Sequence, residues 1–221
     1  MRIPTRRGLR PAAATAIWLT ALALPLAGGC ASTTGEGQVE LRAAGRETAT
    51  LRGDFVAAAF SIGPAATAIY LSDVPVEKLI DGTAATAQVV HMELFWKPRA
   101  GYTPLEDDST NASVRYIVLV DGEVGVYGGA GMLHIHGSLD KQRTRFTLVD
   151  ASMSLIDSTQ GFHDRLSPAQ FDADVVAVKS PEQAMRIRQA VSQRVTNAFG
   201  ETRIVREESD QPAIAAIFTL R

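Results

Sequence analysis

The first 30 residues constrain the fold most, because their pattern is that of an export signal and not of a folded segment. Four arginines and no acidic residue flank or precede an apolar run from Ala12 to Ala27, and Cys30 follows two glycines. A basic start, a short apolar run and small residues before a cleavage site are typical of a secretory signal. The run contains Pro25 and falls short of the roughly 18–20 strongly apolar residues of a spanning helix. We therefore assign residues 1–29 to a signal peptide.

The end of this signal resembles that of a bacterial lipoprotein. Leu26-Ala27-Gly28-Gly29-Cys30 places a lone cysteine after small residues, although Ala27 stands where leucine is usual. The resemblance implies that Cys30 is acylated and becomes the N-terminus of a chain held in the bacterial cell envelope. In such lipoproteins of Gram-negative bacteria, aspartate after the cysteine tends to retain the protein at the inner membrane. Because Ala31 stands there, the resemblance implies the periplasmic face of the outer membrane if the cell is Gram-negative. An ordinary cleaved signal and a retained N-terminal anchor are the alternatives.

The arginines of the signal are compatible with two export routes, the twin-arginine route and the general secretory route. Arg6-Arg7 followed by Gly8-Leu9 resembles the twin-arginine motif, which implies export of an already folded protein. A basic start is common to secretory signals in general, so the general route is the alternative.

Net charge argues against nucleic acid as a partner. The signal holds four of the 22 Lys and Arg residues and none of the 24 Asp and Glu residues, so its removal changes the net charge from −2 to −6. Phosphate backbones require a basic surface. Attraction to anionic lipid is disfavoured for the same reason, so the membrane contact is expected through the lipid anchor.

Cysteine usage excludes several kinds of site. Cys30 is the only cysteine. If it is acylated, the mature chain has no disulfide, no thiol nucleophile and no cysteine-ligated metal. About 190 residues suffice for one domain that is stable on its hydrophobic core alone.

The domain is expected to begin after a tether. Residues 30–47 are small, polar and rich in glycine, apart from a short strand-like start at Val39–Leu41. We therefore predict a lipidated N-terminus and flexible tether over 30–47 and a single, mostly β domain over 48–221.

The pattern of that domain is mainly one of antiparallel strands. Arg115–Val120 and Glu123–Tyr127 flank Asp121-Gly122, which supplies the positive φ angles of a type I′ hairpin turn. The glycine cluster Gly128–Gly131 leads into another strand-like run and not a helix, so it predicts a bulge or sharp bend of the sheet. In the long strand Arg143–Ile156 the apolar alternation slips near Val149-Asp150, which predicts a second bulge.

One helix is clearly marked, over residues 180–199. Ser180 can cap it, Pro181 suits its first turn and Gly200 its end. Its apolar stripe predicts packing against a sheet. The expected fold class is α+β: a sandwich or partial barrel of predominantly antiparallel strands with one C-terminal helix packed on it.

The histidines form the only pattern in the sequence that suggests a metal-binding or catalytic site. His134 and His136 lie two apart on a predicted strand, as do His91 and Glu93 on another, so each pair shares a face. Imidazoles and a carboxylate could bind a divalent metal if the two strands were neighbours. The spacing from Gly128 to His134-Ile135-His136 and Asp140 resembles the first metal motif of cupin β-barrels, with Asp140 in place of glutamate. The resemblance implies a cupin-like metal site or metalloenzyme.

A non-enzymatic role is the main prediction. The sequence contains no Gly-x-Ser-x-Gly elbow and no recognisable pair of catalytic carboxylates. We therefore predict a membrane-anchored binding or structural module without a cofactor, whose partner is an envelope protein or the cell wall. Metal binding through the strand histidines is the alternative.

Overall fold

The fold is a barrel of antiparallel strands with a helix on one side. The computed structural model describes residues 35–45, 49–96 and 110–200, all of which lie in one unit of the chain. Within these ranges the elements are β1 (Glu36–Ala43), β2 (Thr50–Phe55), β3 (Ala57–Ile62), β4 (Thr67–Ser72), α1 (Val76–Ile80), β5 (Thr86–Leu94), β6 (Ala112–Val120), β7 (Glu123–His136), β8 (Arg143–Ser158), β9 (Ala169–Lys179) and α2 (Pro181–Phe199). The predicted α+β class, dominated by antiparallel strands, is confirmed.

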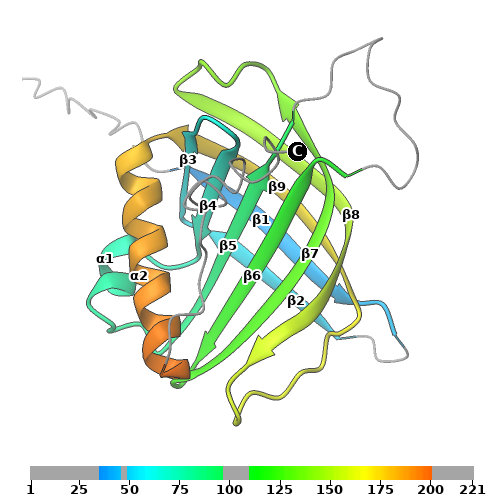
Figure 1. The fold of residues 1–221 in the computed structure, drawn as a ribbon, viewed down its shortest axis with the longest axis vertical. Coiled ribbons are helices and arrows are strands. Elements are labelled where there is room, and N and C mark those ends of the chain that lie inside the picture. Colours follow the sequence, from blue (N-terminus) through cyan, green and yellow to red (C-terminus); the bar gives the residue numbers. More distant parts are fainter. Residues whose placement is uncertain (1–34, 46–48, 97–109, 201–221) are drawn as a thin grey trace, which may run out of the picture. The chain divides into compact units, whose positions relative to one another are not determined.

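A pairing between the last two strands closes the sheet. The strand order is β2-β1-β9-β3-β4-β5-β6-β7-β8, and β8 also pairs with β9. Strand β9 contacts β1 along most of its length but meets β3 only at its C-terminal end, in a short parallel contact. The β1–β2 hairpin and β3 therefore share one edge of β9. Figure 1 shows β5, β6 and β7 crossing in front of β1 and β2, with both helices at one side.

Successive side chains of a strand point to opposite faces of the sheet, and the barrel has a separate hydrophobic core on each face. The inward-facing side chains fill the interior, and the largest fully buried ones include Leu41, Phe60, Tyr116, Phe146 and Phe171. The second core lies outside the wall, where apolar residues of β3 to β7 meet the buried stripe of α2. A sheet that is apolar on both faces in this region must be covered on both, and α1 and α2 provide the outer cover.

The local signals of α2 act as predicted. The Ser180 side chain accepts a hydrogen bond from the Gln183 N–H, which satisfies one of the free donors of the first turn. Gly200 closes the helix in a left-handed conformation with φ of 73°. The apolar stripe, with Ile187 and Val195 fully buried, packs on the sheet.

Both predicted bulges are confirmed. The register of β7 against β8 shifts between Ala130 and Met132, within the glycine cluster. The register of β8 against β9 shifts between Leu148 and Ala151, and Asp150 there has a positive φ of 54°. The turn between β6 and β7 is also as expected, since Asp121 and Gly122 have φ of 49° and 91°.

The predicted boundary between tether and domain is wrong. Residues 36–43, assigned to the tether, form β1, which pairs with β2 on one side and β9 on the other. Its Val39 and Leu41 belong to the interior core. The sequence did not reveal this strand because it carries a glycine and three charged residues. The last part of the predicted domain, residues 201–221, lies outside the described residues.

Candidate functional site

The structure does not bring the four predicted metal ligands together. His91 and Glu93 lie on β5, whereas His134 and His136 lie on β7, and β6 runs between these strands. Arg115 of β6 is opposite both His91 and Gly128, and His134 is six residues beyond Gly128 along β7. Two strand spacings and six residues separate the two pairs, far beyond the about 2 Å of a metal–nitrogen bond. The single four-ligand site is therefore a wrong prediction, and nowhere do three His, Cys, Asp or Glu residues group around a common point in the described ranges.

The two histidine pairs also differ in environment. His134 and His136 are exposed on the outer surface of the barrel wall, and His136 Nε2 contacts the Thr147 hydroxyl of β8. The motif that resembles that of cupins thus faces outward. Asp140 lies in the β7–β8 hairpin, where its side chain accepts a hydrogen bond from Ser138.

His91, by contrast, is buried in the outer core. Its ring stacks on Tyr70 with centroids 4.4 Å apart, and its Nε2 has no hydrogen-bond partner in the described part of the chain. Burial lowers the pKa of His91, the positive charges of Arg115 and Arg188 contribute a smaller part, and together they bring it to about 3. The ring is therefore neutral at pH 7 and serves as a packing element between the wall and its cover.

The outer wall of the barrel has one covered half and one open half. The helices cover β3 to β7, whereas the outer surface of β2, β1, β9 and β8 carries no element among the described residues. We call this second surface the open face. Most of its outward residues are polar or charged, the apolar exceptions being Val149, Ile156 and Val176. They include six acids and four arginines: Glu36, Glu40, Asp54, Asp150, Asp172, Asp174, Arg42, Arg52, Arg143 and Arg145.

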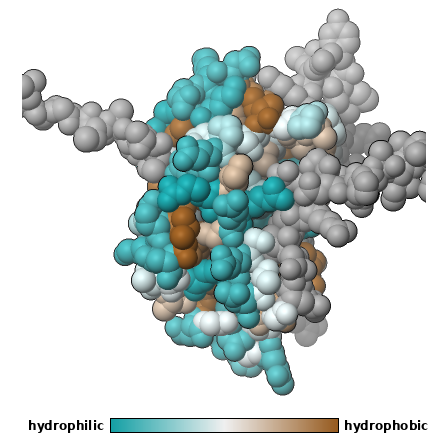
Figure 2. All heavy atoms as spheres, turned by 60° about the vertical axis from the view of Figure 1, so that its left-hand side comes forward, coloured by the Kyte–Doolittle hydropathy of each residue, from teal (hydrophilic) through white to brown (hydrophobic). Residues whose placement is uncertain are grey.

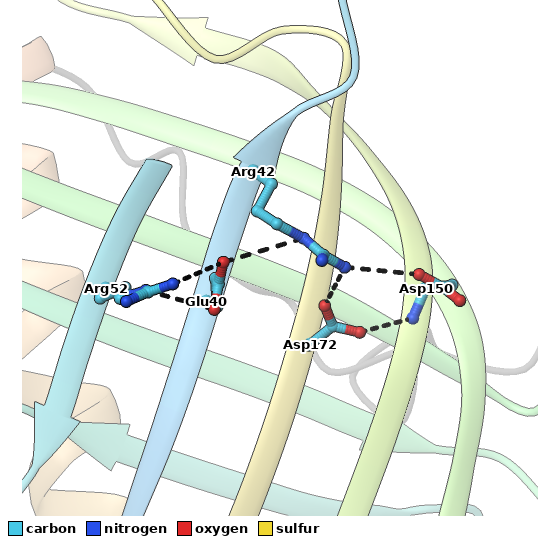
Figure 3. Close-up of polar contacts among 5 residues, drawn as sticks. All are labelled: Glu40, Arg42, Arg52, Asp150 and Asp172. Atoms are coloured by element: carbon cyan, nitrogen blue, oxygen red, sulfur yellow. Dashed lines mark hydrogen bonds and ion pairs between the residues drawn. The ribbon is translucent and has the colours of Figure 1, made fainter. Parts of the chain in front are cut away.

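A network of ion pairs crosses all four strands of the open face (Figure 3). Arg52 of β2 lies 3.3 Å from the Glu40 carboxylate of β1, and Glu40 lies 3.9 Å from Arg42. Arg42 reaches across to β9 and β8, with its Nη2 2.5 Å from Asp172 and 3.5 Å from Asp150. Asp172 also accepts a hydrogen bond of 2.8 Å from the Asp150 N–H, which holds the bulge of β8 in place.

A second cluster lies beside this network on the same face. Arg145 of β8 donates two hydrogen bonds to Asp174 of β9, at 2.8 and 2.5 Å. These bonds hold the pKa of Asp174 below its usual range, and the nearby His136 adds to the effect. An open depression of about 550 Å³ between the two clusters is lined by polar groups that include Gln38, Asp54 and Thr147. The face can therefore present both signs of charge in fixed positions to a partner.

The helix side of the molecule also has a groove, but of a different kind. A depression of about 650 Å³ runs along α2 beside the β6–β7 turn and is lined by Gln189, Gln193, Arg194 and Asn197 among others. Arg194 in it is held by a hydrogen bond of 2.9 Å to the Ala84 carbonyl. Figure 2 shows this side as mainly hydrophilic, with hydrophobic residues only in separate places. We favour the open face as the site because its charges are interlinked across four strands.

Sequence reasoning did not identify the open face. The signal was present as charged residues at alternate positions, such as Glu40 and Arg42 or Asp172 and Asp174. Only the strand order brings these positions side by side. Residues 97–109, which include the acidic run Glu106-Asp107-Asp108, lie outside the described residues.

Comparison with known proteins and the search for membrane-spanning helices give no further information about this site. No helix within the described ranges is long and apolar enough to cross a membrane. Comparison of the chain with family models, curated proteins and solved structures gives no match.

Proposed function

We propose that this chain is a lipid-anchored lipoprotein of the bacterial envelope that binds another envelope component through its open face. The anchor rests on Leu26–Cys30, and the binding role rests on the network from Arg52 to Asp150. The site is held by backbone pairing and by its own ion pairs, and the proposed role needs no cofactor. The periplasmic face of the outer membrane remains the favoured location if the cell is Gram-negative.

The network is the observation that carries this proposal. Its side chains remain between 28% and 76% exposed. Ion pairs as exposed as these contribute only about 0–1 kcal/mol each to stability. Fold stability is therefore a poor reason for so many of them, whereas charge complementarity at an interface gives specificity and speeds association.

The charges of the open face indicate the chemistry of the partner. Six acids against four arginines leave a modest acidic surplus, which suits a partner with basic groups and disfavours polyanions such as nucleic acids. An envelope protein or a cell-wall polymer with free amines fits this description.

The anchor is tested by the intact mass and location of the protein. We expect the protein purified from cells to lack residues 1–29 and to carry acyl chains on Cys30, and Cys30→Ser to leave the membrane fraction. A protein of unmodified mass, or a Cys30→Ser variant that is still acylated, would contradict the anchor.

Binding is tested by photocrosslinking in intact cells. A photoreactive amino acid at Asp54 on the open face should give an adduct of discrete mass, whereas the same group at Met185, which is 55% exposed on α2, should not. Arg42→Glu should weaken the adduct because it leaves Asp172 and Asp150 facing a third acid. Equal adducts at both positions, or none from the open face, would exclude the proposed site.

A further inference from the structure

The two exposed aromatic side chains of the described residues are neighbours in sequence. Phe95 is 45% and Trp96 is 39% exposed, directly after β5, whereas the other exposed large hydrophobic residues there are aliphatic or methionine. Scattered apolar residues are normal on a protein surface, but adjacent exposed aromatic residues at the end of a strand are not explained by packing.

Strand directions place these aromatic residues at the end of the barrel where the chain enters. Strand β9 is antiparallel to β1, so the end of β9 adjoins the start of β1. Strand β3 runs parallel to β9, and β4 and β5 then alternate, so β3 and β5 also finish at this end. Ile62, 46% exposed, is the last residue of β3 and lies in the row Ile62–Thr67–Leu94, next to Phe95. Figure 1 shows the start of β1 and the β3–β4 hairpin at the same, upper end. We call Ile62, Phe95 and Trp96 the apolar rim.

The covalent path from the anchor to this end is short. Gly35 is buried, and a side chain on it would meet the Ala58 and Val176 carbonyls at 2.3 and 2.4 Å, so the chain is fixed there. Five residue steps join Cys30 to Gly35, and a chain of that length spans at most about 18 Å. The 11 residues of β9 extend about 36 Å at the rise of a strand. The tether is thus too short to bring the opposite end of the barrel round to the anchor.

We propose that the apolar rim lies against the lipid surface and orients the barrel on the membrane, with Trp96 and Phe95 in the interfacial layer. This inference rests on the proposed acylation of Cys30. Tryptophan favours the membrane interface because its ring is apolar and its N–H still finds polar partners there. Combining acyl chains with a second membrane contact is a common way of stable anchoring.

Charge does not drive this contact. Among the described residues of this end, Lys141, Arg143 and Lys179 are balanced by Glu36, Asp140 and Glu182. The contact should therefore form on zwitterionic lipid and should persist at high salt, because hydrophobic burial is not screened.

The mature chain provides its own probe for this contact. Trp18 lies in the signal, so Trp96 is the only tryptophan after cleavage. We would reconstitute the acylated protein into phosphatidylcholine vesicles whose lipids are brominated along the acyl chains, since bromine quenches an indole only on contact. Trp96 should lose most of its emission relative to unbrominated vesicles, and its spectrum should shift to the blue. Ile62→Asp with Phe95→Asp, both at exposed positions, should restore most of the emission.

A matched control moves the probe to the other end of the molecule. Trp96→Phe combined with Val120→Trp places the single indole at the end of β6, where Val120 is 39% exposed. This indole should keep its emission in brominated vesicles. Full emission of Trp96, or equal quenching of both indoles, would overturn the proposed orientation.

The apolar rim can be tested even if Cys30 proves not to be acylated. If intact mass shows no acylation, the chain from Cys30 onward is coupled through its single thiol to a maleimide phospholipid and the quenching is repeated. Quenching of Trp96 in that form supports the apolar rim even though the natural anchor is absent, and its absence there rejects the rim.

Discussion

At the scale of single residues, burial decides the chemistry of the histidines. His91 has lost its solvent and gained two arginines as neighbours, whereas His134 and His136 remain in water on the outer wall. The same residue type thus gives a packing element in one strand and a surface group in another. Spacing along the chain could not distinguish these outcomes.

The burial of His91 predicts an acid-sensitive fold. An unfolded chain protonates this residue near pH 6.5, but the folded protein does so only near pH 3, so between these values the unfolded state binds more protons. Lowering the pH through this window therefore destabilises the fold, with a slope from this residue of at most about 1.4 kcal/mol per pH unit. His91→Phe keeps a ring against Tyr70 and removes the titration, so its free energy of unfolding should fall less steeply from pH 6.5 to 4. Urea titrations at several pH values check this, and parallel curves for both proteins would show the assignment to be wrong.

At the scale of the elements, bulges and caps place the functional surfaces. The bulge of β8 turns Asp150 toward Arg42, which extends the network to a fourth strand. The glycine cluster of β7 allows β8 to lie unusually close. The sequence indicated the bulge of β8 by a break in the alternation of polar and apolar residues, and that of β7 by its run of glycines.

Close contact in the glycine cluster predicts intolerance to a single methyl group. A Cβ on Gly129 would lie 2.0 Å from the Ser152 carbonyl oxygen, which belongs to the backbone of β8. Gly129→Ala should therefore destabilise the protein by about 1–3 kcal/mol, as other overpacking substitutions do. Gly45→Ala, whose Cβ would meet no atom within 4 Å, is the matched control and should change stability by less than about 0.5 kcal/mol. Equal denaturation midpoints for the two variants would contradict the close approach.

The packing of α2 on the sheet predicts that substitutions at buried and exposed positions of this helix differ in their effect on stability. Ile187 is fully buried against the wall, whereas Met185 on the same helix is 55% exposed. Ile187→Ala should cost about 2–5 kcal/mol, because it removes buried methyl groups and leaves a cavity. Met185→Ala should stay within about 0.5 kcal/mol of the parent. Thermal and urea unfolding of both variants provide the test, and a mild effect at Ile187 would mean that the helix is not packed as described.

At the scale of the whole molecule, the barrel has three surfaces of different character. The helices cover one half of the outer wall, the open face exposes paired charges on the other, and the apolar rim lies at the end of the barrel where β1 begins. A lipid-anchored binding protein needs a membrane-facing end and a free face, and these two surfaces are adjacent but distinct.

The position of β1 predicts which N-terminal truncation abolishes folding. Without β1, strand β9 loses its main partner on one side and the interior loses Val39 and Leu41. A fragment that begins at Thr48 should therefore lack a cooperative unfolding transition, whereas one that begins at Ala31 should retain it. Circular dichroism during urea titration distinguishes the two, and a cooperative transition in the shorter fragment would show that β1 is dispensable.

The sequence by itself determined the local features and the fold class. The hairpin at Asp121-Gly122, both bulges and the limits of α2 depend on neighbours within a few residues, and all were predicted. The antiparallel character followed from alternation and turn chemistry for the same reason. The signal and the acylation of Cys30 remain predictions of the sequence alone.

Only the tertiary structure decided which strands are neighbours. The insertion of β1 between β2 and β9, the separation of His91 from His134 by β6, and the meeting of Arg42 with Asp172 all depend on pairings between residues far apart in the chain. Such pairings are selected by the collective burial of two cores, to which each strand contributes only a few side chains. A periodic pattern tells which face of a strand is buried, but it does not tell which strand lies beside it.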